Sequence, residues 1–275
     1  MRPSVVLWIL AVVLTLFSAS WQRRTGPTHP VKGRAEVAGQ ALSWTFERTH
    51  KGAGDQEVRI KAPAGVTANL EWRKHLGAPE YTVVPMRRDG ETLVAELPWQ
   101  PPAGVLKYRV VAEANGASVT VPADGVVTIR YTGEVPAPIM VTHILLMITA
   151  MLLSARAGLE CFAREPRLKF YTHLALGVLL VGGFIFGPLV LKHAFGFWWT
   201  GWPIGTDITD NKTLIGLAGW LVALFGVHRV QKPRAWVAFA SLLMFLVFMI
   251  PHSYKGTGFE EPVPPAKPAA GSVQK

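Results

Sequence analysis

The sequence predicts an α+β membrane protein in which an exported all-β sandwich, of the immunoglobulin or fibronectin-like kind, is followed by a four-helix transmembrane bundle. Three observations lead to this prediction. Half of the 275 residues are hydrophobic and only 17% are charged, against about 25% in soluble chains. The apolar residues gather in long runs, which favours membrane helices. One long segment instead alternates apolar and polar residues, which favours β-strands.

The first apolar run, Val5 to Phe17, follows Arg2 and precedes the small residues Ser18-Ala19-Ser20. A short apolar core between a basic residue and small residues is typical of a secretory signal peptide. A signal anchor that continues to Trp21 explains the same pattern. We therefore expect residues 1–20 to be a signal peptide or a signal anchor, and the segment that follows to be exported.

Residues 28–135 are predicted to form the exported sandwich. The clearest alternating runs are Leu42–Phe46, Glu57–Lys61, Ala68–Trp72, Leu106–Val111 and Val126–Tyr131, with Gly, Pro, Asp-Gly or Asn-Gly turns between them. Runs at this spacing predict about seven or eight strands. The chain has one cysteine, Cys161, outside this segment, so the sandwich core must hold without a disulfide. We find no catalytic constellation here, which favours a binding or spacer module over an enzyme.

Residues 137–252 are predicted to form the four-helix bundle, and the Pro-rich residues 253–275 a disordered tail. The four apolar runs are Pro138–Ala155, Tyr171–Leu191, Leu214–Val230 and Ala235–Ile250. Each approaches the roughly 20 residues that cross a bilayer core. The GxxxG pattern from Gly183 to Gly187 indicates a close contact between two of these helices.

The distribution of basic residues predicts the orientation. Two links are basic, and they contain Arg156, Arg164, Arg167 and Lys169, and Arg229, Lys232 and Arg234. In the link between them, Lys192 and Lys212 are set against Asp207 and Asp210. The positive-inside rule therefore places the two basic links in the cytoplasm, and the sandwich and tail on the periplasmic side of a bacterial inner membrane. The net charge of +10 reflects this topology, and we expect no nucleic-acid partner.

The link between the second and third of these four apolar runs is unusually aromatic and polar. Its candidate ligand residues are Trp198, Trp199, Trp202, Asp207, Asp210, Asn211 and Lys212. One interpretation is an aromatic belt at the membrane surface, with Thr209 or Asp210 as the N-cap of the next helix. The other is a ligand site, because so many aromatic and charged residues exceed what a turn requires.

Five histidines fall into two layers of the predicted bundle. His143, His193 and His252 lie towards the exported side, and His173 and His228 towards the cytoplasmic side. Two such layers would suit two b-type haems, since imidazole is a common axial haem ligand. The alternative is that these are interfacial histidines without a cofactor. No tight metal-binding motif is present.

The loop sequence Trp-Pro-x-Gly-x-Asp-x-Thr-Asp-Asn-Lys-Thr, within Thr200–Thr213, together with Ile250-Pro-His-Ser253, resembles an uncharacterised family of bacterial multi-pass membrane proteins. The resemblance covers about His143 to Ser253 and implies a location, with no activity to carry over. We expect a non-catalytic complex subunit or binding module, whose partners are the lipid bilayer and membrane-complex subunits. A haem-containing or quinone-linked electron-transfer protein is the alternative.

Overall fold

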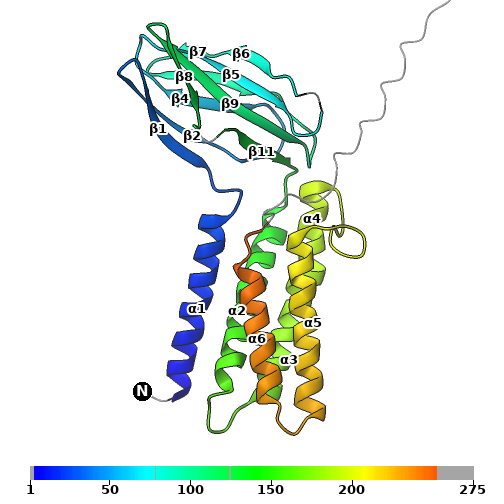
Figure 1. Ribbon diagram of the computed structural model, residues 1–275. Coiled ribbons are helices and arrows are strands. Elements are labelled where there is room, and N and C mark those ends of the chain that lie inside the picture. The colour runs from blue at the N-terminus through cyan, green and yellow to red at the C-terminus, as the bar shows by residue number, and fades with distance from the viewer. Residues whose placement is uncertain (1–2, 78, 124, 253–275) are drawn as a thin grey trace, which may run out of the picture.

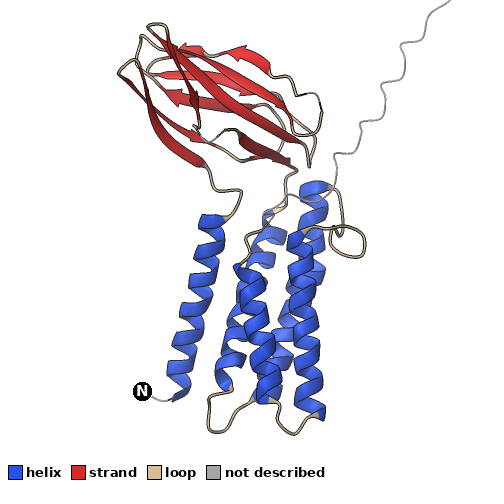
Figure 2. Ribbon diagram, in the orientation of Figure 1, coloured by secondary structure: helices blue, strands red, loops and turns tan. Residues whose placement is uncertain are grey.

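The computed structural model describes residues 3–77, 79–123 and 125–252, and shows a β-sandwich standing on one end of a group of helices (Figure 1). Strands and helices occupy separate bodies along the long axis of the molecule (Figure 2). The chain enters the sandwich from one helix, α1, and leaves it into another, α2, so both connections lie on the side that faces the helices.

The predicted order, a sandwich followed by four helices, is wrong because an N-terminal helix precedes the sandwich and packs with the others. Helix α1 (Pro3–Thr25) buries Ala11, Thr15 and Ser18 on one face. The Gln22 side chain donates a hydrogen bond to the carbonyl of Phe248. The predicted order left this helix out of the bundle because residues 1–20 were taken as a signal peptide or signal anchor, whereas no helix breaker interrupts the chain between Pro3 and Gly26.

In the described chain the helices therefore form five rods. These are α1, α2 (Ala137–Glu160), a continuous rod of α3 (Leu168–Leu179), the π-helix η1 (Leu180–Phe186) and α4 (Gly187–Phe195), then α5 (Ile208–Arg229) and α6 (Arg234–Met249). Three helices, Ser4–Thr25, Ala137–Glu160 and Leu168–Phe195, are long and apolar enough to cross a membrane. Helix α6 is apolar but shorter. The protein thus has the helices of a membrane protein.

Glycines on the third rod allow its neighbours to approach closely. A Cβ atom at Gly182 would lie 2.9 Å from Cβ of Leu146 on α2, and one at Gly183 would lie 2.7 Å from Cγ2 of Thr213 on α5. Real side chains do not tolerate such separations, so these small residues set the helix spacing. Of the predicted GxxxG pair, Gly183 makes such a contact, whereas the atoms nearest to a Cβ at Gly187 would be 3.7 Å away, an ordinary contact. The third rod therefore packs against both α2 and α5 through its glycines.

A buried ion pair lies at the end of the bundle opposite the sandwich. Helix α2 continues past the predicted end at Ala155, so that Arg156 and Glu160 are buried one helical turn apart and pair with each other. The Arg156 guanidinium lies 5.4 Å from the ring of Trp8 and 4.6 Å from that of Tyr171. Arg156 is therefore a packed helix residue, not a free charge of the basic link.

The sandwich consists of two sheets, with more strands than the seven or eight predicted. One sheet has the order β1 (Val31–Val37), β2 (Gln40–Phe46), β4 (Gln56–Lys61), β8 (Thr92–Leu97), β7 (Arg87–Asp89). The other has the order β3 (Thr49–Lys51), β11 (Val127–Thr132), β9 (Val105–Ala114), β5 (Thr67–Lys74), β6 (Thr82–Pro85), with β10 (Ala117–Val121) also paired to β9. Strands β3, β6 and β7 are too short to show an alternating pattern.

The inward residues of both sheets form one apolar core without a disulfide. On β9 the alternate residues Leu106, Tyr108, Val110 and Ala112 are buried, as the period of two predicts. Cys161 lies in the helical body. The Asn115-Gly116 pair forms a two-residue hairpin between β9 and β10, with φ of 49° and 77°, the backbone that such turns require.

Candidate functional site

The loop between α4 and α5 is held in one conformation by the side chains predicted to bind a ligand. The Asp210 carboxylate accepts hydrogen bonds from the Thr200 backbone N–H at 2.6 Å and from its hydroxyl at 2.8 Å. The Asn211 side-chain oxygen accepts from the Trp202 N–H at 2.6 Å. A Cβ atom at Gly201 would lie 2.7 Å from Cβ of Asp210, so only glycine fits there. These acceptors therefore hold the loop against the start of α5.

The N-cap of α5 is Asp207, not the predicted Thr209 or Asp210. Its carboxylate accepts from the N–H groups of Thr209 at 2.6 Å and Asp210 at 3.2 Å. The side chain is buried, and burial raises the pKa of this carboxyl while the two N–H donors act in the opposite direction. Asp207 also interacts with Arg130 on β11 of the sandwich. Burial lowers the pKa of Arg130, and the negative charge of Asp207 raises it.

The three loop tryptophans occupy different environments. Trp199 stacks on Phe184 with a ring separation of 5.6 Å, and its indole N–H donates to the carbonyl of Trp202 at 3.0 Å. Trp198 and Trp202 are exposed, at 57% and 69%. Trp199 is therefore part of the packing around η1, whereas the rings of Trp198 and Trp202 are largely open to their surroundings.

Lys212 is the most deeply buried charged residue of the predicted loop site, with 2% of its surface exposed. Its ammonium group donates to the carbonyl of Ile250 at 2.8 Å and to Nδ1 of His252 at 3.2 Å. Over the described ranges, no carboxylate lies within 4.0 Å of it. The lysine thus ties the first turns of α5 to the end of α6.

His143 and His193, assigned with His252 to one layer, lie in different surroundings. His143 on α2 hydrogen-bonds through Nδ1 to the carbonyl of Gly182, at 2.9 Å, inside the π-helix η1. π-helical turns inside longer helices often occur at functional sites. His143 and His252 are close enough to interact electrostatically. The His193 side chain is exposed instead. The structure therefore brings His143, Lys212 and His252 together and leaves His193 outside the group.

His173 and His228, the histidines predicted for the opposite layer, contact each other. Their Nε2 atoms lie 3.3 Å apart, and the rings meet edge to face at 84°. Two axial haem ligands must lie on opposite sides of the iron, so their nitrogens would be about 4 Å apart at imidazole–metal bond lengths of roughly 2.0 Å. A porphyrin does not fit between these two rings.

The junction between sandwich and helices was not predicted. The N–H of Gly133, just after β11, donates to the carbonyl of Ala194 on α4 at 2.8 Å. A Cβ atom at Gly133 would collide with the carbonyl oxygen of His193. The guanidinium of Arg130 lies 5.9 Å from the ring of Phe195. No pattern local to Gly133 indicates such a contact, because its partner lies far along the chain.

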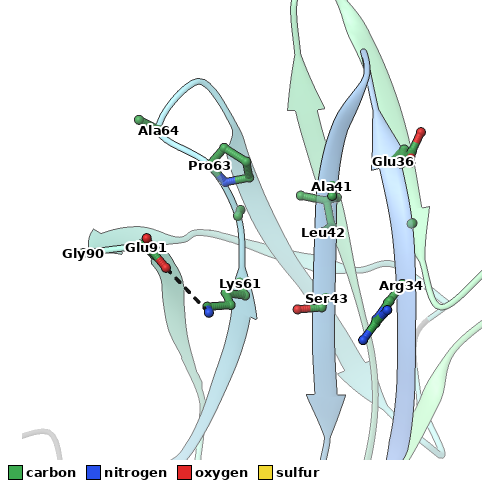
Figure 3. Close-up of a pocket in the computed structure, with 12 residues that line it drawn as sticks. Arg34, Glu36, Ala41, Leu42, Ser43, Lys61, Pro63, Ala64, Gly90 and Glu91 are labelled. Carbon is green, nitrogen blue, oxygen red and sulfur yellow. Dashed lines mark ion pairs between the residues drawn. The ribbon is translucent and has the colours of Figure 1, made fainter.

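A pocket of about 950 Å³ opens on the outer side of the five-stranded sheet (Figure 3). Strands β2 and β4 pair only at Ser43 with Lys61 and at Trp44 with Ile60. Beyond Lys61 the chain no longer follows β2, and the pocket lies where the two strands separate. The buried residues Leu42 and Ala62 lie among its lining. Its charged lining residues are Arg34, Glu36, Lys61 and Glu91, and Lys61 pairs with Glu91 at 3.6 Å. No sequence pattern indicates this pocket, since it depends on where two strands separate.

Comparisons with known proteins add little to this site. No protein-family model matches the chain, and a comparison with curated proteins finds no match. Among solved structures, a chain titled "Crystal structure of Br derivative BhCBM56" matches with 10% sequence identity and a TM-score of 0.24, over 38% of this chain and 92% of that chain. A likeness at this TM-score carries no information on fold or ligand.

Proposed function

We propose that this protein is a non-catalytic subunit or binding module of a bacterial inner-membrane complex, in which the helices hold the β-sandwich in a fixed position on the periplasmic surface. The junction at Gly133 carries this proposal. A spacer domain needs only a flexible tether, whereas this sandwich is bonded to the end of α4 by its own backbone. Fixed presentation lowers the entropy lost when a partner binds.

The polar loop supports the same proposal. Asp210 and Asn211 use their acceptors to hold the loop, and Asp207 caps α5 beside Arg130 of the sandwich. In this proposal, the loop residues that were predicted to bind a ligand instead stabilise the end of the helical body that contacts the sandwich. Their function is to keep the end of the bundle rigid.

The binding surface in this proposal is the pocketed face of the five-stranded sheet. The pocket is surrounded by charged groups of both signs, whereas Leu42 and Ala62 at its base belong to the sandwich core and expose little surface. Charged groups of both signs favour a partner with a complementary charge pattern. A protein partner in the same membrane complex fits this surface best.

Orientation in this proposal follows from the basic residues. Arg164, Arg167 and Lys232 lie in the links at the end of the bundle opposite the sandwich, and Arg234 is the first residue of α6 at the same end. The positive-inside rule then places that end in the cytoplasm and the sandwich outside. Reporter fusions after Arg167 and Arg234 should be active as cytoplasmic fusions, and an external result at Arg167 would reverse the orientation.

Site-specific photo-crosslinking in intact cells tests the binding surface. A photoreactive residue at Ser43, inside the pocket, should give one discrete adduct with a partner protein. The matched control is Glu113, an exposed residue on β9 of the other sheet, which should give no such adduct. No adduct at Ser43, or equal adducts at both positions, would contradict the proposal.

A further inference from the structure

The contact between His173 on α3 and His228 on α5 has the geometry of a metal site. Two ligands of a tetrahedral ion, each bound at roughly 2.0–2.1 Å, stand about 3.3–3.4 Å apart. The two Nε2 atoms are 3.3 Å apart. This separation suits neighbouring ligands of one small ion, although it is too short for the opposed ligands of a haem.

A hydrogen bond to His173 leaves its Nε2 atom able to bind a metal. Nδ1 of His173 hydrogen-bonds to the carbonyl of Lys169, at 2.6 Å, and a carbonyl can only accept. The ring proton is therefore on Nδ1 and the lone pair on Nε2, which points at His228. An outer hydrogen bond of this kind is the usual support of a metal-binding histidine.

We propose that His173 and His228 form an open two-histidine site for a divalent transition-metal ion, with water in the remaining positions. Without metal, Nε2–H of His228 donates to Nε2 of His173. On binding, the metal takes the lone pairs of both Nε2 atoms, and the His228 proton moves to Nδ1 of the same ring. Each ring stays neutral and no proton is lost overall.

The composition of the site narrows the choice of ion. Across the described ranges no third His, Cys, Asp or Glu joins the pair, so the site has no carboxylate or thiolate. Lys169, about one helical turn before His173, and Arg229, next to His228 in the sequence, are positively charged and repel cations. An ion that binds imidazole strongly is required, and Zn²⁺ and Cu²⁺ meet this need. Both histidines are exposed at the end of the bundle, so the ion can enter.

A metal at this site would join α3 to α5 at the end remote from the sandwich. The two helices already pack together, so the ion would stabilise an existing contact and would not create a new one. Metal binding is thus independent of the sandwich and of the proposed partner surface.

Copper titration followed by electron paramagnetic resonance tests the site on the full chain in lipid nanodiscs, purified without a histidine tag. Wild-type protein should bind one Cu²⁺ with a spectrum of two nitrogen ligands. H173Q and H228Q should each weaken this binding at least tenfold. H193Q is the matched control, because His193 is exposed on the same rod at its other end, and it should bind as wild type does.

Thermal unfolding provides the second readout. Without metal, both glutamine variants should unfold as wild type does, which shows that they fold. Zn²⁺ should raise the Tm of wild type and of H193Q, and leave H173Q and H228Q unchanged. Equal copper binding in all four proteins, loss in H193Q as well, or binding only at millimolar copper would mean an adventitious ion only and would overturn the proposal.

Discussion

Ionisable residues lie at both ends of the helical body, but their hydrogen-bond partners differ. At the sandwich end, Asp207, Asp210 and Lys212 form hydrogen bonds to backbone groups of their own loop or of a neighbouring helix end. At the opposite end, His173 and His228 bond to each other at the surface. The sequence shows polar and ionisable residues at both ends, and only their partners distinguish a structural role from a site open to a ligand.

The buried charges at the two ends also have different partners. Arg156 has a carboxylate partner and two aromatic neighbours at the opposite end. Lys212 at the sandwich end has a carbonyl and an imidazole instead. In the ion pair, the two opposite charges stabilise each other. Among the described residues, Lys212 has only neutral acceptors, and both lie at the end of α6, so its hydrogen bonds depend on the position of that helix. At both ends a buried charged side chain therefore joins a helix to another segment of the chain: Glu160 accepts from the N–H of Arg167, and Lys212 donates to the carbonyl of Ile250.

The largest expected effect comes from α1. Because Trp8 covers Arg156 and Gln22 bonds to the end of α6, we expect α1 to stay in the mature protein as an anchor. The intact mass of protein purified from its membrane, with a tag at the C-terminus only, should include residues 3–25. A mass that corresponds to a chain starting after Ser20 would show that α1 is a cleaved leader and that its contacts do not persist.

The next effect is at the ion pair. Glu160→Gln keeps an acceptor for the N–H of Arg167 and leaves the buried Arg156 charge unpaired. We expect a loss of about 3–5 kcal/mol in the free energy of unfolding, measured by denaturant titration in micelles. The double variant Arg156→Met/Glu160→Gln removes both charges and should regain most of this loss. Equal destabilisation in both variants would show that the pair is not the cause.

A smaller effect is expected at the N-cap of α5. Asp207→Ala removes the acceptor of two backbone N–H groups and should cost about 0.5–2 kcal/mol. Asp207→Asn keeps a capping oxygen and should stay within about 0.5 kcal/mol of wild type. The same denaturant titration compares the two. If the asparagine variant lost partner crosslinking at Ser43 while its stability was unchanged, Asp207 would belong to a ligand site after all.

The smallest effect is expected at Trp202, whose ring is exposed. Trp202→Phe should change the free energy of unfolding by less than about 0.5 kcal/mol. Trp199→Phe is the contrast, because it also removes the indole N–H that donates to the carbonyl of Trp202. The phenylalanine at 199 should therefore be the more destabilising of the two, as judged by thermal unfolding. The reverse order would contradict the description of the loop.

Sequence patterns predicted the elements that have a strong period, and missed what depends on contacts between distant residues. The strands around Leu42–Phe46 and Leu106–Val111 and the Asn115-Gly116 turn follow from alternation and turn chemistry. Helix α1 was expected as a signal peptide or signal anchor and not as a packed member of the helical body, although its buried Ala11, Thr15 and Ser18 form a helical face. That spacing, visible in the sequence, could have shown that α1 packs against other helices.

The candidate site shows the same limit. The loop residues were recognised as unusual, yet their hydrogen bonds to Thr200 and Trp202 depend on a tight turn at Gly201 that composition does not reveal. The contact between His173 and His228 joins residues far apart in the chain. Depth along each helix predicted that they share a layer, and only helix packing brings their rings together.

The fixed position of the sandwich is tested most directly by a distance measurement between the two bodies. In a Cys161→Ala background, spin labels at Glu113 on β9 and at Ile204 in the exposed part of the loop report this distance in nanodiscs. We expect one narrow distance distribution for the otherwise native chain. Gly133→Val, whose side chain would collide with the His193 carbonyl, should broaden it. A broad distribution without the Gly133 substitution, or one that this substitution leaves unchanged, would contradict a sandwich held by this junction.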